Sequence, residues 1–396
     1  MALGHDHGHE RPSMAALTSG LTRRVLTGVI AAVLLATLVG LVLLWPDGDR
    51  DITAPELGFT GELVDAEVTL ADVVPCAGTT EVDGILCTEV SFHVSNGPTE
   101  GDAAAFQVPI TDASVSFEEG DGIVLIYEAA NEPQFQYRFS DFQRRTPLTV
   151  LWILFVGAVV ALGRWQGVRA LVGLLVTGVV MVGFLFPSIL DGHDPTAVAL
   201  VSASVIGVVA LYLTHGVSER TTVALLGTFG ALALTAVLAA VFSAAAHFTG
   251  FGTEDAFYLQ VAASSVDIKG LVLAGIIIGS LGVLDDVTVT QVSAVWQLRM
   301  ANPSYRVREL YGAAVRIGRD HIASTVNTLV LAYAGASLPL LLVYTQAGRR
   351  LSDVATGELV AVEIVRTLVG SIGLVAAVPI TTALAAIVAV RGGDGG

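Results

Sequence analysis

Long apolar runs recur along this chain, and they constrain its fold more than any other feature. Eight runs each approach the roughly 20 residues that a helix needs to cross a bilayer, and short polar breaks or one longer polar segment separate them. Only 14% of the 396 residues are charged, against about 25% in a typical soluble domain. The pattern predicts an α-helical polytopic membrane protein with about eight transmembrane helices.

The eight runs divide into one anchor and a group of seven. The first occupies residues 23–46, follows two arginines, and lacks the small-residue cleavage site of a signal peptide, so we interpret it as an uncleaved anchor. The other seven form a membrane domain over residues 147–391. They span residues 148–163, 170–190, 196–214, 222–247, 270–296, 318–344 and 361–390. An even number of spans predicts that both termini lie on one side of the membrane.

The segment between the anchor and the second run, residues 47–146, has a different character. Residues 47–147 contain 20 acidic and 4 basic side chains, and their net charge of −16 equals that of the whole chain. Strand-like patterns cover residues 62–70, 88–94 and 122–127, with turn-forming clusters between them. We therefore predict a small all-β domain, barrel-like or sandwich-like. Its acidity argues against nucleic acid as a partner and is typical of a solvated surface, although it could attract cations.

Cysteine usage and basic residues indicate which side this β-domain faces. Cys76 and Cys87 are the only cysteines, and a disulfide between them would require an oxidising, extracytoplasmic compartment. Metal ligation by the two thiolates is the alternative, but no nearby Cys/His pair completes a zinc pattern. With both termini cytoplasmic, 12 basic residues fall on the cytoplasmic side and 7 outside. Both signals predict an extracytoplasmic β-domain between the first two spans.

The two ends of the chain are predicted to be disordered, over residues 1–22 and 392–396. The N-terminal tail contains His5, His7 and His9, and imidazole is a good ligand for zinc, copper and nickel. Three histidines on a flexible tail make a weak metal site. An incidental polar tail explains the pattern equally well.

Ionisable groups inside a bilayer are costly, which makes each one a functional hypothesis. Asp285 and Asp286 lie well inside the run 270–296, and because adjacent carboxylates repel, one should hold a proton or face a cation. Asp286 also belongs to a stripe at helical spacing. That stripe consists of Gly275, Gly279, Gly282, Asp286, Thr290, Ser293 and Gln297. We interpret its glycines as a helix-packing seam and the two aspartates as functional.

The next span, 318–344, carries polar residues on two adjoining faces. Asp320, Ser324 and Asn327 share one face, and His321, Ser324 and Thr328 share the other. Asp320 and His321 lie near the expected cytoplasmic interface, where charge costs little, so a purely structural role stays open for them.

The last span, 361–390, has two oppositely charged residues near its outer end. Glu363 and Arg366 are three residues apart and can pair on one helical face. We interpret them as a structural ion pair, with a substrate site as the alternative.

Several catalytic signatures are absent from the sequence. It has no Gly-x-x-x-x-Gly-Lys-Ser/Thr phosphate loop and no His-Glu-x-x-His metalloprotease motif. Ser280 lacks the glycine two residues earlier that marks a nucleophilic serine. We therefore expect a protein that is not an enzyme.

Three long motifs resemble those of the YibE/F-like membrane proteins. They run from Gly279 to Gln291, from Gly318 to Pro339 and from Arg366 to Pro379, and the shorter pieces 163–169 and 211–216 fit as well. The resemblance covers roughly residues 135–390. It implies a bacterial multi-pass membrane protein of a kind usually described as a transporter or permease. It carries over no catalytic or binding residues.

These observations lead to two hypotheses of different classes. The first is a secondary transporter of the bacterial cytoplasmic membrane for a cation or a cation- or proton-coupled solute, with no certain cofactor. Asp285 and Asp286 would bind a divalent cation or a proton, and Asp320 and His321 would relay protons. The polar path would be completed by Thr288, Thr290, Gln291, Ser324, Asn327 and Thr328. Its partners would be the lipid bilayer, the solute or ion, and other copies of itself. The second is an envelope assembly or signalling protein whose external β-domain binds a partner.

Overall fold

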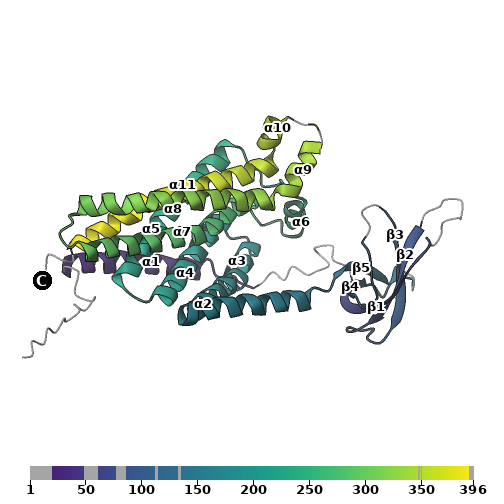
Figure 1. The fold of residues 1–396 in the computed structure, drawn as a ribbon. Coiled ribbons are helices and arrows are strands. Elements are labelled where there is room, and N and C mark those ends of the chain that lie inside the picture. Colours follow the sequence, from purple (N-terminus) through teal and green to yellow (C-terminus); the bar gives the residue numbers. More distant parts are fainter. Residues whose placement is uncertain are drawn as a thin grey trace, which may run out of the picture. The chain divides into compact units, whose positions relative to one another are not determined.

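The computed structural model describes residues 20–48, 61–76, 86–111, 115–132, 135–346, 348 and 350–391. The histidines of the N-terminal tail and residues 392–396 lie outside these ranges. Contacts between Cα atoms divide the chain into two compact units, residues 52–164 and the remainder. Figure 1 draws both units, which are described separately below.

The first unit contains a five-stranded antiparallel sheet in the order β3-β2-β1-β4-β5. Its strands are β1 (Glu62–Pro75), β2 (Leu86–Val94), β3 (Ala103–Pro109), β4 (Gly122–Tyr127) and β5 (Tyr137–Phe142). The three strand-like patterns of the sequence fall in β1, β2 and β4. The sequence did not indicate β3 and β5, which are short and have few fully buried residues.

Aromatic side chains fill the core of this sheet and curl it. Phe106 of β3 stacks on Phe139 of β5 with ring centroids 6.0 Å apart, although these strands are at opposite edges of the sheet. Phe117 packs edge-on against both rings. The two edges therefore approach one another, which gives the sheet a barrel-like curvature, one of the two forms that the sequence left open.

A disulfide between Cys76 and Cys87 joins the end of β1 to the start of β2, as the sequence predicts. It closes a loop with a sequence separation of 11 residues. A loop of this size corresponds to about 3 kcal/mol of restricted unfolded-state entropy.

We expect Cys87→Ser to destabilise the β-domain by about 2–3 kcal/mol, because the loop is then no longer constrained in the unfolded chain. Thermal unfolding of the full-length protein in detergent, followed by protease sensitivity of the β-domain, measures this. Treating the wild-type protein with reductant should reproduce the shift and should leave Cys87→Ser unaffected. An unchanged midpoint in both experiments would contradict the stabilising role of the disulfide.

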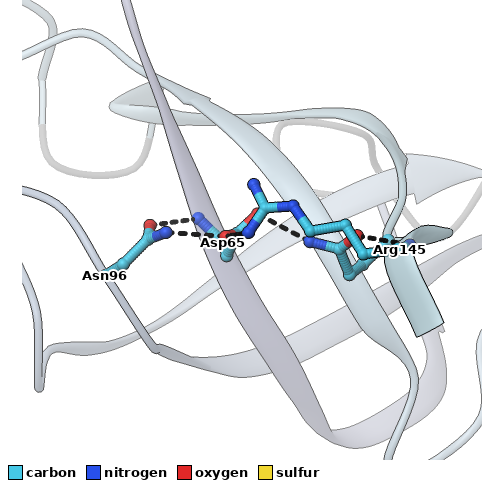
Figure 2. A network of polar contacts seen from close by, with 4 residues as sticks. Asp65, Asn96 and Arg145 are labelled. Carbon is cyan, nitrogen blue, oxygen red and sulfur yellow. Dashed lines mark hydrogen bonds and ion pairs between the residues drawn. The ribbon is translucent and has the colours of Figure 1, made fainter. Parts of the chain in front are cut away.

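A polar network connects β1 to the start of the helix that follows the sheet (Figure 2). The carboxylate of Asp65 accepts hydrogen bonds from Asn96 at 2.6 Å, from Gln143 at 3.1 Å and from Arg145 at 2.9 Å. Next to it, the Arg144 guanidinium donates a hydrogen bond to Asp141 and holds the pKa of that carboxyl below its ordinary value. Asp65 thus anchors three segments that are distant in the sequence.

We expect Asp65→Ala to destabilise the β-domain by roughly 1.5–3 kcal/mol, because three donors lose a charged acceptor. Arg145→Ala should cost under about 1 kcal/mol, since its side chain is 74% exposed and exposed ion pairs contribute little. Thermal melts of the two variants, measured side by side, test this ranking. Equal shifts would show that Asp65 is not the centre of the network.

The second unit is helical and contains most of the membrane-length helices. In order, the helices of the chain are α1 (Gly20–Leu43), α2 (Arg145–Val180), the π-helix η2 (Met181–Leu185), α3 (Phe186–Leu190), α4 (Pro195–His215), α5 (Glu219–Ala245), α6 (Glu254–Ala262), α7 (Ile268–Ala301), α8 (Val307–Ala336), α9 (Leu338–Gln346), α10 (Leu351–Thr356) and α11 (Glu358–Arg391). Within the described residues, six helical runs are long and apolar enough to cross a membrane, or seven if the bent α8–α9 pair is one span.

Two of the expected spans, 148–163 and 170–190, lie in one helical run from Arg145 to Leu190. A helix of these 46 residues would be roughly 70 Å long, more than twice the thickness of a hydrocarbon core. The run is interrupted at Arg164, whose φ of 49° is not helical. The expected total of eight spans therefore requires Arg164 to separate two of them.

The helix expected at 318–344 differs from the one observed. α8 already begins at Val307, because Leu310, Ala314 and Gly318 recur every four residues and are buried in the helical core. At the other end α8 stops at Ala336, and α9 continues at an angle of 60°. Pro339, the second residue of α9, has no backbone N–H, and its ring would clash with the carbonyl group of Gly335 in a continuous helix, which explains the break.

Four long helices, α5, α7, α8 and α11, lie side by side (Figure 1). Gly275 lies near Arg366 and Gln291 binds Thr382, so α7 and α11 run in the same direction. α5 runs opposite to α11, because Gly227 faces Thr381 whereas Thr235 faces Gly373. α8 runs opposite to α7, because Gly318 approaches Gln291 whereas Tyr333 approaches Gly279. The bundle thus alternates in direction along the chain, as successive membrane spans would.

Candidate functional site

A group of polar side chains lies at the centre of this bundle, and we call it the interior cluster. It consists of Thr228 of α5, Asp285, Thr288 and Gln291 of α7, and Thr381 and Thr382 of α11. Five of the six are fully buried, and Asp285 is half-buried. Such a concentration of buried polar groups among apolar helices requires internal partners.

Side-chain hydrogen bonds tie the cluster together across helices. The hydroxyls of Thr228 and Thr288 are 2.7 Å apart and join α5 to α7. Thr382 donates to the amide oxygen of Gln291 at 3.0 Å and joins α11 to α7. Thr288 also lies 3.1 Å from the backbone carbonyl of Asp285, one turn earlier in α7. The cluster therefore fixes the register of three helices around Asp285.

The fourth helix, α8, approaches the cluster at a glycine. A Cβ atom placed on Gly318 would lie 2.6 Å from the amide nitrogen of Gln291 and 2.6 Å from a methyl group of Val378. Only a residue without a side chain fits there. Gly318 thus brings the backbone of α8 against the interior cluster.

Three buried atoms of the cluster have no hydrogen-bond partner among the described residues. They are Oδ1 of Asp285, Nε2 of Gln291 and Oγ1 of Thr381. An unsatisfied buried polar atom costs about 1–3 kcal/mol. The set mixes an acceptor, a donor and a hydroxyl, which fits water molecules and a mobile proton better than a bare metal ion. The described residues contain no group of three His, Cys, Asp or Glu side chains that could hold a metal.

Asp286 and His321 form a second polar contact at the edge of the cluster. Nε2 of His321 lies 3.6 Å from Oδ2 of Asp286, an ion pair when the imidazole is protonated. The Asp286 side chain is 70% exposed, whereas its neighbour Asp285 turns inward. The two aspartates therefore face different surroundings, which the sequence could not distinguish.

The remaining polar residues of α7 and α8 that the sequence singled out lie away from the interior cluster. Thr290 is half-buried and occupies the same helical stripe as Asp286. The others are exposed along one side of α8: Asp320, Ser324, Asn327 and Thr328. The structure therefore separates the sequence-derived candidates into an inner and an outer group.

Glu363 and Arg366 form an ion pair of 2.7 Å near the start of α11. Both line a cavity of about 350 Å³ that also contacts Asp255 and Glu358. Glu363 in addition borders an apolar cavity of about 440 Å³ between α8 and α11, where Tyr333 lies.

Ser280 and Thr235 are buried on the neighbouring helices between these cavities and the interior cluster. The ion pair thus stands at one end of a line of polar side chains.

Three members of the interior cluster were missed by sequence reasoning: Thr228, Thr381 and Thr382. Isolated threonines are common in membrane helices, since their hydroxyls bond to the preceding turn of the same helix. One signal was available, because Thr381 continues the small-residue stripe of Gly370, Gly373 and Ala377 in α11. At Gly373 and Thr381 this stripe packs directly against α5.

A comparison with protein families identifies this region. The family model described as YibE/F-like protein matches residues 151–391. The chain belongs to the YibE/F-like family. No curated protein and no solved structure matches it. The whole interior cluster, the His321–Asp286 contact and the Glu363–Arg366 pair all lie within the YibE/F-like region, whereas the β-strands precede it.

Proposed function

We propose that this YibE/F-like protein is a secondary transporter of the bacterial cytoplasmic membrane. It moves a cation or a proton-coupled solute, and Asp285 carries the coupling ion. The observation that carries this proposal is the buried Oδ1 atom of Asp285, which lacks a hydrogen-bond partner among the described residues. Two other atoms of the interior cluster, Nε2 of Gln291 and Oγ1 of Thr381, likewise lack one there. An ionisable group in that position is costly, and in membrane proteins such groups mark ion and proton pathways.

Polar residues occur along the length of α11 and on the helices beside it. They support a path for the coupling ion through the bundle. The cavity at Glu363 and Arg366 supplies an opening at one end, with Ser280 and Thr235 further in. The interior cluster follows, and His321 lies beside Asp286 at its edge. In this proposal the donor and acceptor mixture around Asp285 favours a proton as the coupling ion. The solute crosses unchanged, and no chemical reaction is catalysed.

The proposed topology has eight spans, with both termini in the cytoplasm and the β-domain outside. The Cys76–Cys87 disulfide supports an extracytoplasmic β-domain, because such bonds persist in oxidising compartments. The distribution of basic residues supports cytoplasmic termini. The break at Arg164 supports a division of the Arg145–Leu190 run into two spans, which this topology requires.

The proposal is tested in bacterial cells that lack the native copy of the gene. The double variant Asp285→Asn with Asp286→Asn should fail to restore any solute uptake, efflux or metal tolerance that the wild-type protein restores. Membrane abundance of the variant must equal that of the wild type. Full restoration by the double variant would contradict a transport role for the two carboxyl groups.

A second candidate function rests on the β-domain. A cavity of about 900 Å³ on this domain is lined by Phe106, Phe135 and Tyr137, with Glu89 and Arg138 among its polar residues. A large concave surface of aromatic and charged side chains fits a protein or peptide partner. In this alternative the protein assembles or signals in the envelope, and its buried polar groups only hold helices together.

Deleting residues 55–140 separates the two candidates. A transporter whose site is the interior cluster should retain part of its transport, because the cluster lies entirely in the helical unit. An assembly or signalling protein should lose its partner and its phenotype completely. Size-exclusion chromatography of the deleted protein in detergent controls for misfolding of the remaining helices.

A further inference from the structure

The exposed side of α8 carries polar residues in the middle of a membrane-length helix. We call these residues, Asp320, Ser324, Asn327 and Thr328, the α8 polar face. All four are exposed in the single chain, and they recur at spacings of four, three and one residues on one side of the helix. Asp286 of α7, whose side chain is 70% exposed, lies at the edge of this face beside His321.

Such a face is unsuited to contact with lipid. Asp320 lies near the cytoplasmic end of the expected span, where charge costs little, but Ser324, Asn327 and Thr328 lie deeper. An amide or hydroxyl in hydrocarbon lacks any hydrogen-bond partner. On α5, by contrast, the exposed side chains include large apolar ones such as Val237 and Val241. The α8 polar face therefore needs a covering that supplies polar groups.

The groups on the face are complementary to themselves. The Asn327 amide both donates and accepts hydrogen bonds, as do the hydroxyls of Ser324 and Thr328. Arg316 is exposed one turn before Asp320, so the face carries both signs of charge four residues apart. Around a two-fold axis, Arg316 of one copy can meet Asp320 of the other, and Asn327 can meet its own equivalent.

The backbone geometry allows a second helix to approach closely. Cβ atoms added to Gly282 of α7 or Gly335 of α8 would meet no atom within 4 Å, so both glycines open onto unoccupied space. Small residues of this kind permit close contact between membrane helices, and central asparagines favour association. The open glycines and the self-complementary polar groups together identify what covers the α8 polar face. It is the α8 polar face of another copy of the chain.

We propose that the α8 polar face is a homodimer interface, covered by a second copy of this chain about a two-fold axis along the membrane normal. This inference rests on the proposed function, in which α8 spans the bilayer. In the dimer, the Asp286–His321 contact of each copy lies at the rim of the interface. Two copies are then needed to shield the α8 polar face from lipid.

Cysteine cross-linking in native membranes tests this interface without any transport measurement. Both natural cysteines are engaged in the disulfide, so an introduced cysteine supplies the only thiol. Ser324→Cys and Asn327→Cys should each form about tenfold more covalent dimer than the exposed control Val237→Cys, because the interface holds the two thiols together. Cross-linking no stronger than in the control, or to a protein of another mass, would overturn the proposal.

A second variant keeps the test independent of cysteine geometry. Asn327→Leu should raise the dimer dissociation constant in liposomes about three- to tenfold, the effect of losing one interhelical hydrogen bond. Thr345→Val, on α9 and outside the face, should leave it unchanged. A monomeric wild type whose Asn327→Cys variant reacts with a membrane-impermeant maleimide would instead identify a water-lined surface and overturn the interface. A transport-inactive protein that still cross-links would leave the interface standing and contradict only the proposed function.

Discussion

Gly227→Ala is expected to lower the melting temperature of the detergent-solubilised protein by roughly 2–3 °C, which corresponds to about 2 kcal/mol of overpacking in a chain of this size. Gly227 of α5 faces Thr381 of α11 at the centre of the bundle. A Cβ atom at Gly227 would lie 2.9 Å from Cβ and 3.0 Å from Cγ2 of Thr381. Rotating the threonine cannot remove the contact with its Cβ, so the two helices must move apart.

Two controls separate this effect from a general cost of alanine. Gly373→Ala, where the same two helices meet again, should cost less, because the nearest atom is the Thr235 hydroxyl and its Cβ is 3.3 Å away. Gly178→Ala in α2 meets no atom within 4 Å and should be neutral or stabilising. Removing the opposing side chain with Thr381→Gly should restore part of the stability of Gly227→Ala. If all three glycine variants melt alike, the α5–α11 contact does not limit the packing of the bundle.

Asp285→Asn is expected to reduce proton-coupled transport by about a hundredfold, the usual scale for losing a positioned proton-transfer group. The amide keeps the size of the side chain but cannot bind and release a proton. The fold should persist, since the Thr228–Thr288 and Thr382–Gln291 hydrogen bonds do not involve the Asp285 carboxyl group. The measurement is the initial rate of solute uptake into proteoliposomes under an imposed pH gradient.

Two further variants test whether the loss of transport is specific to the carboxyl group of Asp285. Glu254→Gln removes a carboxylate from the exposed first turn of α6, far from the cluster in the chain, and should leave the rate unchanged. Thr382→Val should lower stability, because it leaves the buried oxygen of Gln291 without its 3.0 Å hydrogen bond. A wild-type rate in folded Asp285→Asn would remove this residue from the transport path.

Most of the helical architecture could be predicted from hydrophobicity alone. The runs at 196–214, 222–247, 270–296 and 361–390 each lie within a few residues of α4, α5, α7 and α11, since length and apolarity decide whether a segment spans a bilayer. The start of α8 could not be predicted this way. Arg308, Arg316 and Arg319 make its first half polar, and only the burial of Leu310 and Ala314 at helical spacing fixes it.

The site was predictable in part. Carboxyl groups inside an apolar run stand out in any sequence, and so Asp285 and Asp286 were both identified. Helical spacing alone does not determine which of the two side chains points into the bundle. That depends on how α7 packs against α5 and α11. Thr228 and Thr382 become recognisable only when the helices bring them together, whereas Thr381 had a signal in the small-residue stripe of α11.

Proton coupling through Asp285 is tested by measuring the internal pH of proteoliposomes that contain the purified wild-type protein. A pH-sensitive dye is enclosed, the membrane potential is clamped with a potassium ionophore, and a panel of cations and small solutes is added one at a time. We expect at least one of them to change the internal pH, and we expect liposomes with Asp285→Asn not to respond to it. A response that is equal in wild type and Asp285→Asn would contradict proton coupling through Asp285.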